Sequence, residues 1–323
     1  MYDYFLRGQK VLFIGPVFYN YHKEIISELQ HVGASVDFYA EKPMYKFFIM
    51  NYLFVFFRKH FANKYLSTIL KNIESCYDYI FIIRGEIITE EFLNELKHRH
   101  PESKFIMYQW DSIRNNLYDN LLKYFDKTFT FDMIDAKKLN IQYLPLFYIS
   151  KYNNIKLKQN RKYDLVFYGS YHGDRLEIIK AVSNECNKLN LNKKFYLYIP
   201  KTILIKKILT LQIKLSDLQY LSTNPVCDDY IIDLYSNTKA VLDIENINQN
   251  GMTIRTFEVL GSGLKLVTTN KNILNDKIYD SQDIYFLDRS AINLGLFFFK
   301  QIPLKNQKYI NYSLKNWIQN VFS

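Results

Sequence analysis

Short apolar segments alternate with segments of helical periodicity along most of this 323-residue chain. This alternation restricts the fold more than any other feature. Successive strands joined through a helix lie parallel in one sheet, because a parallel connection needs a long crossover. Parallel sheets covered by helices are therefore expected. In the first half the predicted strands are Lys10–Ile14, Ser35–Ala40, Tyr77–Ile83, Lys104–Gln109, Lys127–Phe131 and Gln142–Leu146.

Helical segments lie between most of these strands. Tyr21–Val32 and Thr89–His100 have helical periodicity, and Thr89 is placed to cap the second helix. The polar stretch 150–162 then has the composition of an interdomain linker. A first domain is predicted over residues 1–149.

The same alternation begins again after the linker. The predicted strands are Asp164–Tyr168, Lys194–Ile199, Ala240–Ile244, Leu264–Thr269 and Ile284–Leu287, with a weaker one near Gln219. The predicted helices lie near Asp174–Leu189, Asp229–Ser236 and Thr253–Leu260. A second domain is expected over 163–303, followed at 304–323 by a C-terminal helix that could pack back on the first domain. The fold class is α/β, with two doubly wound, Rossmann-like domains.

Composition limits the class of protein and of partner. Hydrophobic residues make up 48% of the chain and charged residues 23%, as in globular proteins. The formal net charge of +10 favours anionic partners, although A+T-rich codon bias would also enrich lysine. Three widely spaced cysteines suit a reducing cytoplasm. Neither a signal peptide nor an apolar run of about 18 residues is apparent, so a spanning helix is not expected.

The stretch Asn250–Asn270, NGMTIRTFEVLGSGLKLVTTN, carries the strongest functional pattern. A polar approach containing Gly251 leads into a helix whose free backbone N–H groups and dipole favour an anion. Arg255 and Glu258 fall away from the apolar face of this helix, which therefore offers a cation and a carboxylate together. A phosphate at the helix start and sugar hydroxyls one or two turns along would match this layout.

This stretch resembles the carboxy-terminal nucleotide-sugar motif of GT-B glycosyltransferases, in which a helix with a glutamate precedes a small-residue turn and a hydrophobic strand. It is especially similar to the CgeB-like and lipopolysaccharide or O-antigen assembly branch, where an R-x-F-E core is typical and residues 255–258 read RTFE here. Many group 1 relatives carry a second glutamate where this chain has Asn250. Glu245 could lie nearby, at the end of the preceding strand.

The resemblance implies a GT-B fold, with the two domains facing each other across a cleft. It also implies a nucleotide-diphosphate sugar as donor and a bacterial surface glycan as acceptor, namely lipopolysaccharide core, O-antigen or capsule. Inverting and retaining transfer both stay open. Because acceptors in this family are usually membrane-associated, the resemblance implies a cytoplasmic protein bound peripherally at the inner face of the cytoplasmic membrane.

Ligands of doubly wound sheets bind at the carboxyl ends of strands, near the point where the strand order reverses. The loop Gly169–Arg175 follows the first strand of the second half, and Arg175 could give a phosphate a bidentate contact. Alternatively the loop is an ordinary turn with Asp174 as a helix cap. His172 could contact phosphate or be solvated, and Glu258 could bind ribose hydroxyls or be an exposed, ion-paired glutamate. The expected donor-binding residues are Gly169, Ser170, His172, Arg175, Gly251, Met252, Thr253, Arg255 and Glu258.

The first domain is expected to bind the acceptor, and polar residues after its strands are candidates for catalysis. A carboxylate within hydrogen-bond reach of an acceptor hydroxyl could remove its proton as the sugar is transferred. Asp111 is the leading candidate, beside Trp110 as a wall for a sugar ring, although Asp111 could instead cap a helix. Arg84 and Glu86 form a competing acid/base or substrate-positioning pair. Asp132 is a third candidate that could merely cap a helix.

Missing motifs narrow the mechanism. The chain has no D-x-D triplet and no metal-ligand spacing of His, Cys and Asp. We therefore expect neither a metal nor a cofactor, with leaving-group charge offset by Arg255, Arg175 and helix N–H groups. The loop GPVFYNYH after the first strand departs from GxGxxG, which disfavours a dinucleotide-dependent dehydrogenase.

Two segments could meet an acidic membrane surface. Pro43–His60 is almost wholly apolar and aromatic between Phe47 and Phe57, with cations at both ends, and could lie among lipid headgroups or pack on the sheet. Lys201–Lys214 has the same two interpretations, with more weight on core packing.

Two other functions stay open beside sugar transfer. One is another GT-B chemistry, such as sugar-nucleotide epimerisation or polyol-phosphate transfer. The other is a basic protein that binds nucleic acid or an anionic surface. Because lysine and arginine are dispersed and no nucleic-acid motif is recognised, nucleic acid is not the expected partner.

Overall fold

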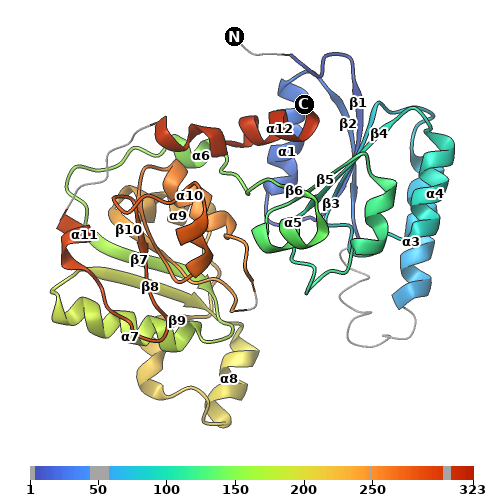
Figure 1. The fold of residues 1–323 in the computed structure, drawn as a ribbon. Coiled ribbons are helices and arrows are strands. Elements are labelled where there is room, and N and C mark those ends of the chain that lie inside the picture. The colour runs from blue at the N-terminus through green and yellow to red at the C-terminus, as the bar shows by residue number, and fades with distance from the viewer. Residues whose placement is uncertain (1–3, 44–57, 248, 301–306) are drawn as a thin grey trace. The chain divides into compact units, whose positions relative to one another are not determined.

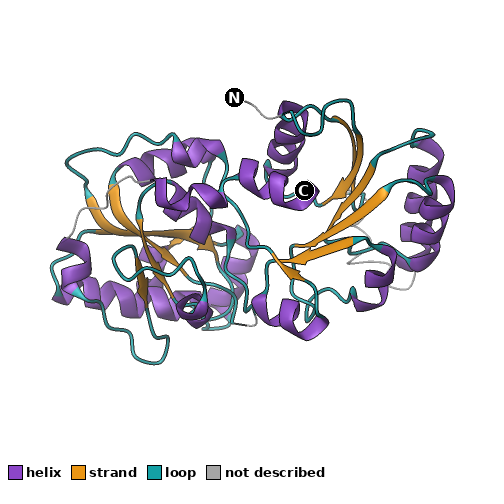
Figure 2. Ribbon diagram, turned by 45° about the horizontal axis from the view of Figure 1, so that its top comes forward, coloured by secondary structure: helices purple, strands orange, loops and turns teal. Residues whose placement is uncertain are grey.

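The computed structural model describes residues 4–43, 58–247, 249–300 and 307–323. The chain forms two compact units: unit 1 is Met1–Pro145 with Leu314–Ser323, and unit 2 is Leu146–Ser313. Within each unit, helices lie on both faces of a central parallel sheet (Figures 1 and 2). The alternation of strands and helices in the sequence thus builds two doubly wound α/β units.

The sheet of unit 1 has the strand order β2-β1-β3-β4-β5-β6, and its neighbouring strands are parallel. The order reverses between β1 and β3, which makes their carboxyl ends the topological switch point. All six strands predicted for the first half are present, with shifts at some ends. They are β1 (Lys10–Gly15), β2 (Ser35–Ala40), β3 (Tyr79–Ile83), β4 (Lys104–Gln109), β5 (Lys127–Thr130) and β6 (Gln142–Tyr143).

Local capping explains where two helices of unit 1 begin. The Thr89 hydroxyl accepts a hydrogen bond from the Phe92 amide, as predicted for this N-cap. Asp132 accepts from the amides of Ile134 and Asp135, so that this carboxylate is a helix cap and not a base in solvent. The helices of unit 1 are α1 (Tyr21–His31), α3 (Arg58–Asn72), α4 (Glu90–Arg99), η2 (Asp119–Tyr124), α5 (Met133–Leu139) and α12 (Leu314–Phe322).

The last helix, α12, packs within unit 1. The Trp317 ring lies 4.7 Å from the Tyr108 ring, and Phe322 lies 5.3 Å from Phe81 (centroid distances). Trp317 is among the largest fully buried side chains. Aromatic burial therefore places the C-terminus with the first sheet, while residues 307–313 belong to unit 2.

The stretch 150–162, expected to be a linker, lies inside unit 2. Its first residues form the short helix α6 (Ser150–Asn153), and Tyr152 and Ile155 are buried. The polar composition of the stretch hid these apolar anchors. The boundary between the units falls at Pro145 and Leu146, several residues before the predicted end of the first domain at residue 149.

The sheet of unit 2 has the strand order β12-β11-β10-β7-β8-β9, with parallel neighbours. This is the Rossmann order 3-2-1-4-5-6, so the switch point lies between β7 and β10. The predicted strands are present, and the weak one near Gln219 is the two-residue β9. The strands are β7 (Tyr163–Ser170), β8 (Lys193–Tyr198), β9 (Leu221–Ser222), β10 (Thr238–Asp243), β11 (Lys265–Thr268) and β12 (Ile284–Phe286).

Close packing fixes the helix that the sequence singled out. A Cβ on Gly261 would come within 2.4 Å of the Tyr148 ring, so glycine lets this helix approach the start of unit 2. Gly263 follows with φ +76°, a left-handed helix end. Besides α6, the helices of unit 2 are α7 (Arg175–Lys188), α8 (Lys201–Leu209), η3 (Leu215–Tyr220), α9 (Asp228–Ser236), α10 (Ile254–Gly261), η4 (Lys271–Asn275), α11 (Leu296–Lys300) and η5 (Gln307–Tyr312).

Candidate functional site

Arg175 ties together the two strands at the switch point of unit 2. Its Nε and Nη2 donate to the Ile244 carbonyl at 2.9 and 2.6 Å, and Nη1 donates to the Ser170 carbonyl at 3.1 Å. Gly169 leaves room for this guanidinium, because a Cβ there would lie 3.3 Å from Nη1. The fork that the sequence suggested for a phosphate thus donates mainly to main-chain carbonyls. Burial, with the positive charge of Arg255 nearby, lowers the pKa of Arg175 to about 10, which leaves it charged at neutral pH.

Arg289, just after β12, joins three loops at the same edge of the sheet. Its Nη1 donates to both carboxylate oxygens of Asp174, at 2.8 and 2.6 Å. Its Nη2 donates to the Glu245 carbonyl at 2.6 Å and lies 2.8 Å from Oε1 of that carboxylate. Thr269, which follows β11, donates its hydroxyl to Oε2 of Glu245. Arg289 was not among the predicted residues, although it follows a predicted strand more closely than Arg175 does.

Burial sets the ionisation of this network. Glu245 is buried, and desolvation raises its pKa even though Thr269 and Arg289 oppose the shift. Burial also disfavours the charge of Arg289, but its hydrogen bond to Asp174 and the charge of Glu245 outweigh this and raise its pKa. Asp174 occupies the N-cap position of α7 but makes no side-chain cap hydrogen bond. The capping role considered for Asp174 is therefore replaced by an ion pair.

The start of α10 carries backbone N–H groups that no side chain caps. Thr253 takes the N-cap position, but its hydroxyl donates to Asp243 at 2.6 Å, and the Thr256 hydroxyl donates to the same oxygen at 3.1 Å. The loop before the helix is fixed by Asn270, whose amide donates to the carbonyls of Asn250 and Gly251 at 3.1 and 3.2 Å. A rigid helix entrance with free donors therefore lies beside the switch point.

Three polar atoms around this entrance are buried without a hydrogen-bond partner within the part of the chain that the structure describes. They are Nε of Arg255, Oδ1 of Asp243 and Nδ2 of Asn250. Nη1 of Arg255 lies 3.7 Å from that Asp243 oxygen. Because buried polar groups in proteins are almost always hydrogen-bonded, a cluster of unsatisfied ones indicates a ligand-binding position.

Arg255 and Glu258 differ from the simple picture of an exposed polar face. The guanidinium carbon of Arg255 lies 4.2 Å from the centroid of the Tyr168 ring, and the side chain is 16% exposed. Glu258 is only 4% exposed, so its interpretation as an exposed, ion-paired glutamate is wrong. Burial raises the pKa of Glu258 to about 8. At neutral pH this carboxyl is mostly protonated.

The other predicted donor residues lie around the same edge. Met252 is buried next to Gly251 in the loop that leads into α10. Ser170 is exposed at the end of β7, and His172 is half-buried two residues later. Burial and the charge of Arg175 lower the pKa of His172, which is therefore neutral at pH 7. All nine predicted donor residues thus come from the connection between the end of β7 and the start of α7, or from α10 and the loop before it.

Arg84 and Glu86 belong to a charge network at the switch-point edge of unit 1. Arg84 contacts both carboxylate oxygens of the buried Glu41 and also binds Glu86, which Lys42 contacts at 2.7 Å. Burial raises the pKa of Glu41, and the charge of Arg84 opposes this shift. Both cations bind the same oxygen of Glu86. The sequence identified the Arg84–Glu86 pair but not Glu41 or Lys42, which come from the end of β2.

The backbone at Arg84 is held in an unusual conformation. Arg84 has φ +65° and the next residue, Gly85, has φ +68°. The amides of Gln109 and Asn116 both donate to the Arg84 carbonyl, at 3.0 and 2.9 Å. Non-glycine residues seldom adopt the left-handed region, and such conformations cluster at functional sites.

Asp111 lies in the loop after β4, between Gln109 and Asn116, whose side chains bind the Arg84 carbonyl. It is half-buried, and its Oδ1 accepts from the Asn115 amide at 3.1 Å. The next helical element, η2, begins only at Asp119, so Asp111 is not a helix cap. The neighbouring Trp110 meets the rings of Phe18 and Tyr21 edge-on, and Phe18 is exposed. An aromatic surface therefore adjoins the candidate base.

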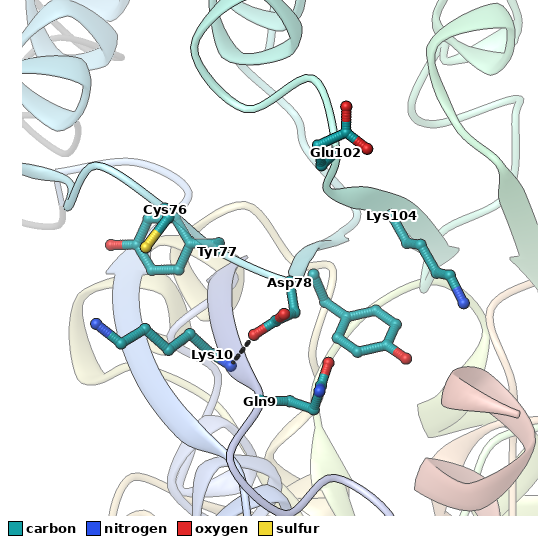
Figure 3. Close-up of a pocket in the computed structure, with 8 residues that line it drawn as sticks. Gln9, Lys10, Cys76, Tyr77, Asp78, Glu102 and Lys104 are labelled. Carbon is teal, nitrogen blue, oxygen red and sulfur yellow. Dashed lines mark hydrogen bonds between the residues drawn. The ribbon is translucent and has the colours of Figure 1, made fainter.

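A separate pocket of about 340 Å³ opens at the opposite edge of the unit 1 sheet. Figure 3 shows Asp78 beside Lys10. The backbone amide of Lys10 donates a hydrogen bond to the Asp78 carboxylate at 2.7 Å. The lining residues come from the amino ends of β1, β3 and β4 and the segments before them. Since ligands of doubly wound sheets bind at the carboxyl ends, this pocket is not the candidate site.

Comparison with known proteins shows the fold. No family model and no curated protein matches the chain. The apo form of the lipopolysaccharide outer core galactosyltransferase WaaB aligns with a TM-score of 0.59 at 12% identity, covering 96% of this chain and 97% of that one. Anabaena Alr3699/HepE in complex with UDP and glucose gives 0.60 at 10% identity, covering 97% and 98%.

A third structure, a putative UDP-N-acetylglucosamine 2-epimerase from Listeria monocytogenes, gives a TM-score of 0.53 at 8% identity, covering 97% and 94%. The chain therefore has the GT-B fold, with two Rossmann-like units. At these identities the likeness defines the fold and leaves the chemistry to the residues of the site.

Metal and membrane features can be examined only in residues 4–43, 58–247, 249–300 and 307–323. Among these residues, no group of three or more His, Cys, Asp or Glu side chains is placed to hold a metal ion. Independence from metal stays a prediction. None of the helices described there has the length and apolar character needed to cross a membrane.

Proposed function

We propose that this protein is a glycosyltransferase that moves a sugar from a nucleotide-diphosphate sugar to a bacterial surface glycan. The observation that carries this proposal is the start of α10, where uncapped N–H groups lie beside two buried donors without a partner among the described residues, Nε of Arg255 and Nδ2 of Asn250. A diphosphate would supply the anionic acceptors that these donors lack. Transfer of a hexose or deoxyhexose to lipopolysaccharide core, O-antigen or capsule is the finer form of the proposal, and WaaB and HepE have the same fold.

Donor binding is assigned to the carboxyl edge of the unit 2 sheet. The diphosphate would lie between the loop after β7 and the start of α10, where Arg255 provides positive charge. Glu258 lies one turn into α10, and its neutral carboxyl can accept a hydrogen bond from one ribose hydroxyl and donate one to the other. Arg175 and Arg289 would act by holding the strand ends in place, because both are already bound to groups of the protein.

Asp111 is the proposed catalytic base. Its carboxylate is bound by a neutral amide, whereas the Glu86 carboxylate is held by Arg84 and Lys42. A base must reach the acceptor hydroxyl and accept its proton, which favours the less committed carboxylate. Arg84 and Glu86 would then position the acceptor, and the aromatic surface at Trp110 would stack against a sugar ring.

Charge stabilisation without a metal is also part of the proposal. Arg255 and the N–H groups of α10 would offset the negative charge that develops on the leaving diphosphate. Turnover should therefore be unchanged by a chelator. Loss of activity with EDTA, restored by a divalent ion, would contradict this assignment.

A second candidate is sugar-nucleotide epimerisation, because the Listeria protein named above as a putative epimerase shares the fold. It would use the same donor site without an acceptor. Polyol-phosphate transfer would differ in the group that leaves the nucleotide. Product analysis separates these chemistries. Epimerisation yields a changed free sugar nucleotide, whereas transfer yields a new glycosidic linkage.

The first experiment is a thermal-shift and nucleotide-release panel with UDP-, GDP-, dTDP- and CDP-linked sugars. One base should stabilise the protein, since a ligand that binds the folded state raises its melting temperature. Nucleoside diphosphate should be released when a lipid-linked or lipopolysaccharide acceptor is added. If no nucleotide stabilises the protein while nucleic acid does, the basic binding-protein alternative replaces the enzyme.

Peripheral association with the inner face of the cytoplasmic membrane completes the proposal, because a glycan acceptor of this kind is anchored in lipid. The aromatic stretch from Phe47 to Phe57, which suggested it, lies outside the described residues. Among the described residues, support for membrane association comes from helix α8 and the turn after it.

A further inference from the structure

Helix α8 and the turn after it expose a row of large apolar side chains. No residue of α8 is buried, and in Figure 1 this helix extends away from the strands of unit 2. Leu209, Leu211 and Leu215 are 78%, 87% and 76% exposed. We call residues 201–218 the α8 surface; its other exposed apolar side chains are Ile203, Ile205 and Leu218. Core packing was the favoured expectation for Lys201–Lys214, and it holds for Leu204, Ile208 and Ile213 but not for these exposed side chains.

The α8 surface is anchored from beneath. Leu204 and Ile208 pack against the core of unit 2, and Ile213 is buried. Leu211 is held in the left-handed region at φ +57°, and its amide donates to the Ile208 carbonyl. A leucine seldom adopts this conformation, and here the turn presents its side chain to solvent. The apolar residues are therefore displayed by a defined turn.

Positive charge is interleaved with these apolar side chains. Four lysines, at positions 201, 206, 207 and 214, lie within a stretch that has no Asp or Glu before Asp217. Asp217 is buried and pairs with Lys180 at 3.1 Å, and its Oδ2 accepts from the Lys214 amide at the same distance. Lys207 lies over the Tyr171 ring, on the side facing the core. Lys201, Lys206 and Lys214 are exposed.

This combination of charge and apolar surface selects one kind of occupant. A second copy of the chain docked through the same surface would bring lysines against lysines. An uncharged protein surface would cover the leucines and leave the lysines without partners. An anionic bilayer accepts both groups, because leucines can enter the boundary of the acyl chains while lysines meet lipid phosphates.

We propose that the α8 surface docks on anionic phospholipid bilayers and holds unit 2 at the membrane. The inference rests on the proposed peripheral location and names the surface responsible, but it does not depend on the transfer reaction. Lipid binding can therefore be measured without donor or acceptor.

The test is flotation of the full-length protein with phosphatidylcholine vesicles, with and without phosphatidylglycerol. The wild type should float only with the anionic vesicles, and less at high salt, since screening weakens lysine–phosphate attraction. Two double variants probe the surface: Leu209→Ser with Leu211→Ser, and Lys201→Glu with Lys206→Glu. Each should reduce the bound fraction at least tenfold.

Matched variants separate this surface from general effects. Leu117 in unit 1 is as exposed as Leu209, at 78%, so Leu117→Ser controls for loss of an exposed leucine. Lys137→Glu with Lys138→Glu makes the same change in net charge on the exposed part of α5. Both controls should float like the wild type. Circular dichroism and the nucleotide thermal shift verify that every variant is folded.

Three results would overturn the inference. Equal flotation of the wild type and the α8 variants would place the contact elsewhere and leave peripheral association intact. A wild type that never floats would remove both statements about the membrane, while the nucleotide panel would still report on the transferase. Concentration-dependent dimers that Leu209→Ser abolishes would assign the surface to a second copy.

Discussion

Arg289 binds both carboxylate oxygens of Asp174 through Nη1, at 2.8 and 2.6 Å, although the two residues are 115 positions apart. The rest of the guanidinium holds Glu245, whose other oxygen binds Thr269. Loops that follow four strands of unit 2 are therefore connected through one arginine. The edge of the sheet assigned to the donor is fixed by the protein itself, which reduces the ordering required when a ligand binds.

Replacing Arg289 tests this connection. Arg289→Ala leaves Glu245 buried without its cation, and breaking a buried pair in this way costs about 3 kcal/mol. The free energy of unfolding should fall by that order, as measured by urea denaturation followed by far-ultraviolet circular dichroism, which reports on both units. Arg99→Ala is the control, because its pair with Glu95 is solvent-exposed. That variant should change the free energy by less than about 1 kcal/mol. Equal losses in the two variants would contradict a buried connecting role.

The buried carboxyl of Glu258 should make stability depend on pH. Its pKa is raised to about 8 in the folded state by burial, against an ordinary value of 4.5. Between these values the unfolded chain has lost the proton that the folded protein keeps, so stability falls as pH rises. Above about pH 8 both states are ionised and this dependence ends. The full effect is on the order of 5 kcal/mol.

Glu258→Gln removes this titration and keeps the shape of the side chain. We expect the variant to gain stability relative to the wild type as pH rises from about 5.5 to about 8.5, a range that covers most of the window between the two pKa values. Urea denaturation of both proteins across that range gives the difference directly. A constant difference would show that Glu258 does not titrate in this window.

Strand positions were predictable from this sequence because each strand is a short apolar run bounded by polar or turn residues. The course of the chain between elements was less accessible. The stretch 150–162 is polar overall, yet Tyr152 and Ile155 are buried and attach it to unit 2. Helix α3 was not predicted, because its apolar and polar residues are only weakly separated onto different faces. Such elements form through tertiary contacts rather than a strong local pattern.

The candidate site was predictable in part for a similar reason. The stretch around α10 has a distinctive order of residues, and the structure places its members at the switch point. Arg289 and Glu41 have no local motif and acquire their role only when distant strand ends meet. Burial of Glu258 was also hidden, because its helical spacing suggested a solvent face. A rule that weighs every polar residue after a strand would have found Arg289.

Gly261 provides a test of the packing that places α10. In Gly261→Ala the new Cβ would lie 2.4 Å from the Tyr148 ring, so the helix or the ring must move. Overpacking of this kind costs about 2 kcal/mol, which should appear as a lower melting temperature in calorimetry. Gly173→Ala is the comparison, because no atom lies within 4 Å and only the positive φ adds strain. If Gly173→Ala were the more damaging change, steric contact would not explain Gly261.

Replacing Arg255 should weaken binding of the diphosphate part of the donor and leave binding of the nucleoside part nearly unchanged. Arg255→Ala removes a charged partner from the diphosphate, a contact worth about 2 kcal/mol, and should weaken nucleoside diphosphate binding by roughly 30-fold. Binding of the same nucleoside without phosphate should change little. Arg255→Lys keeps the charge but not the planar contact with Tyr168, and should fall between the two. Calorimetric titration measures all three; equal weakening for nucleoside and diphosphate would contradict a phosphate role.

Replacing Asp111 should mainly lower kcat, whereas replacing Glu86 should mainly lower stability and acceptor affinity. If Asp111 is the base, Asp111→Asn should lower kcat by about 100-fold or more while nucleotide affinity stays unchanged, because the amide cannot accept the proton. Glu86→Gln weakens the partner of Arg84 and Lys42, so it should lower stability and raise KM for the acceptor with a smaller effect on kcat. Steady-state kinetics with varied acceptor, read beside urea denaturation, distinguishes the two residues. A large loss of kcat in Glu86→Gln with normal stability would transfer the role of base from Asp111 to Glu86.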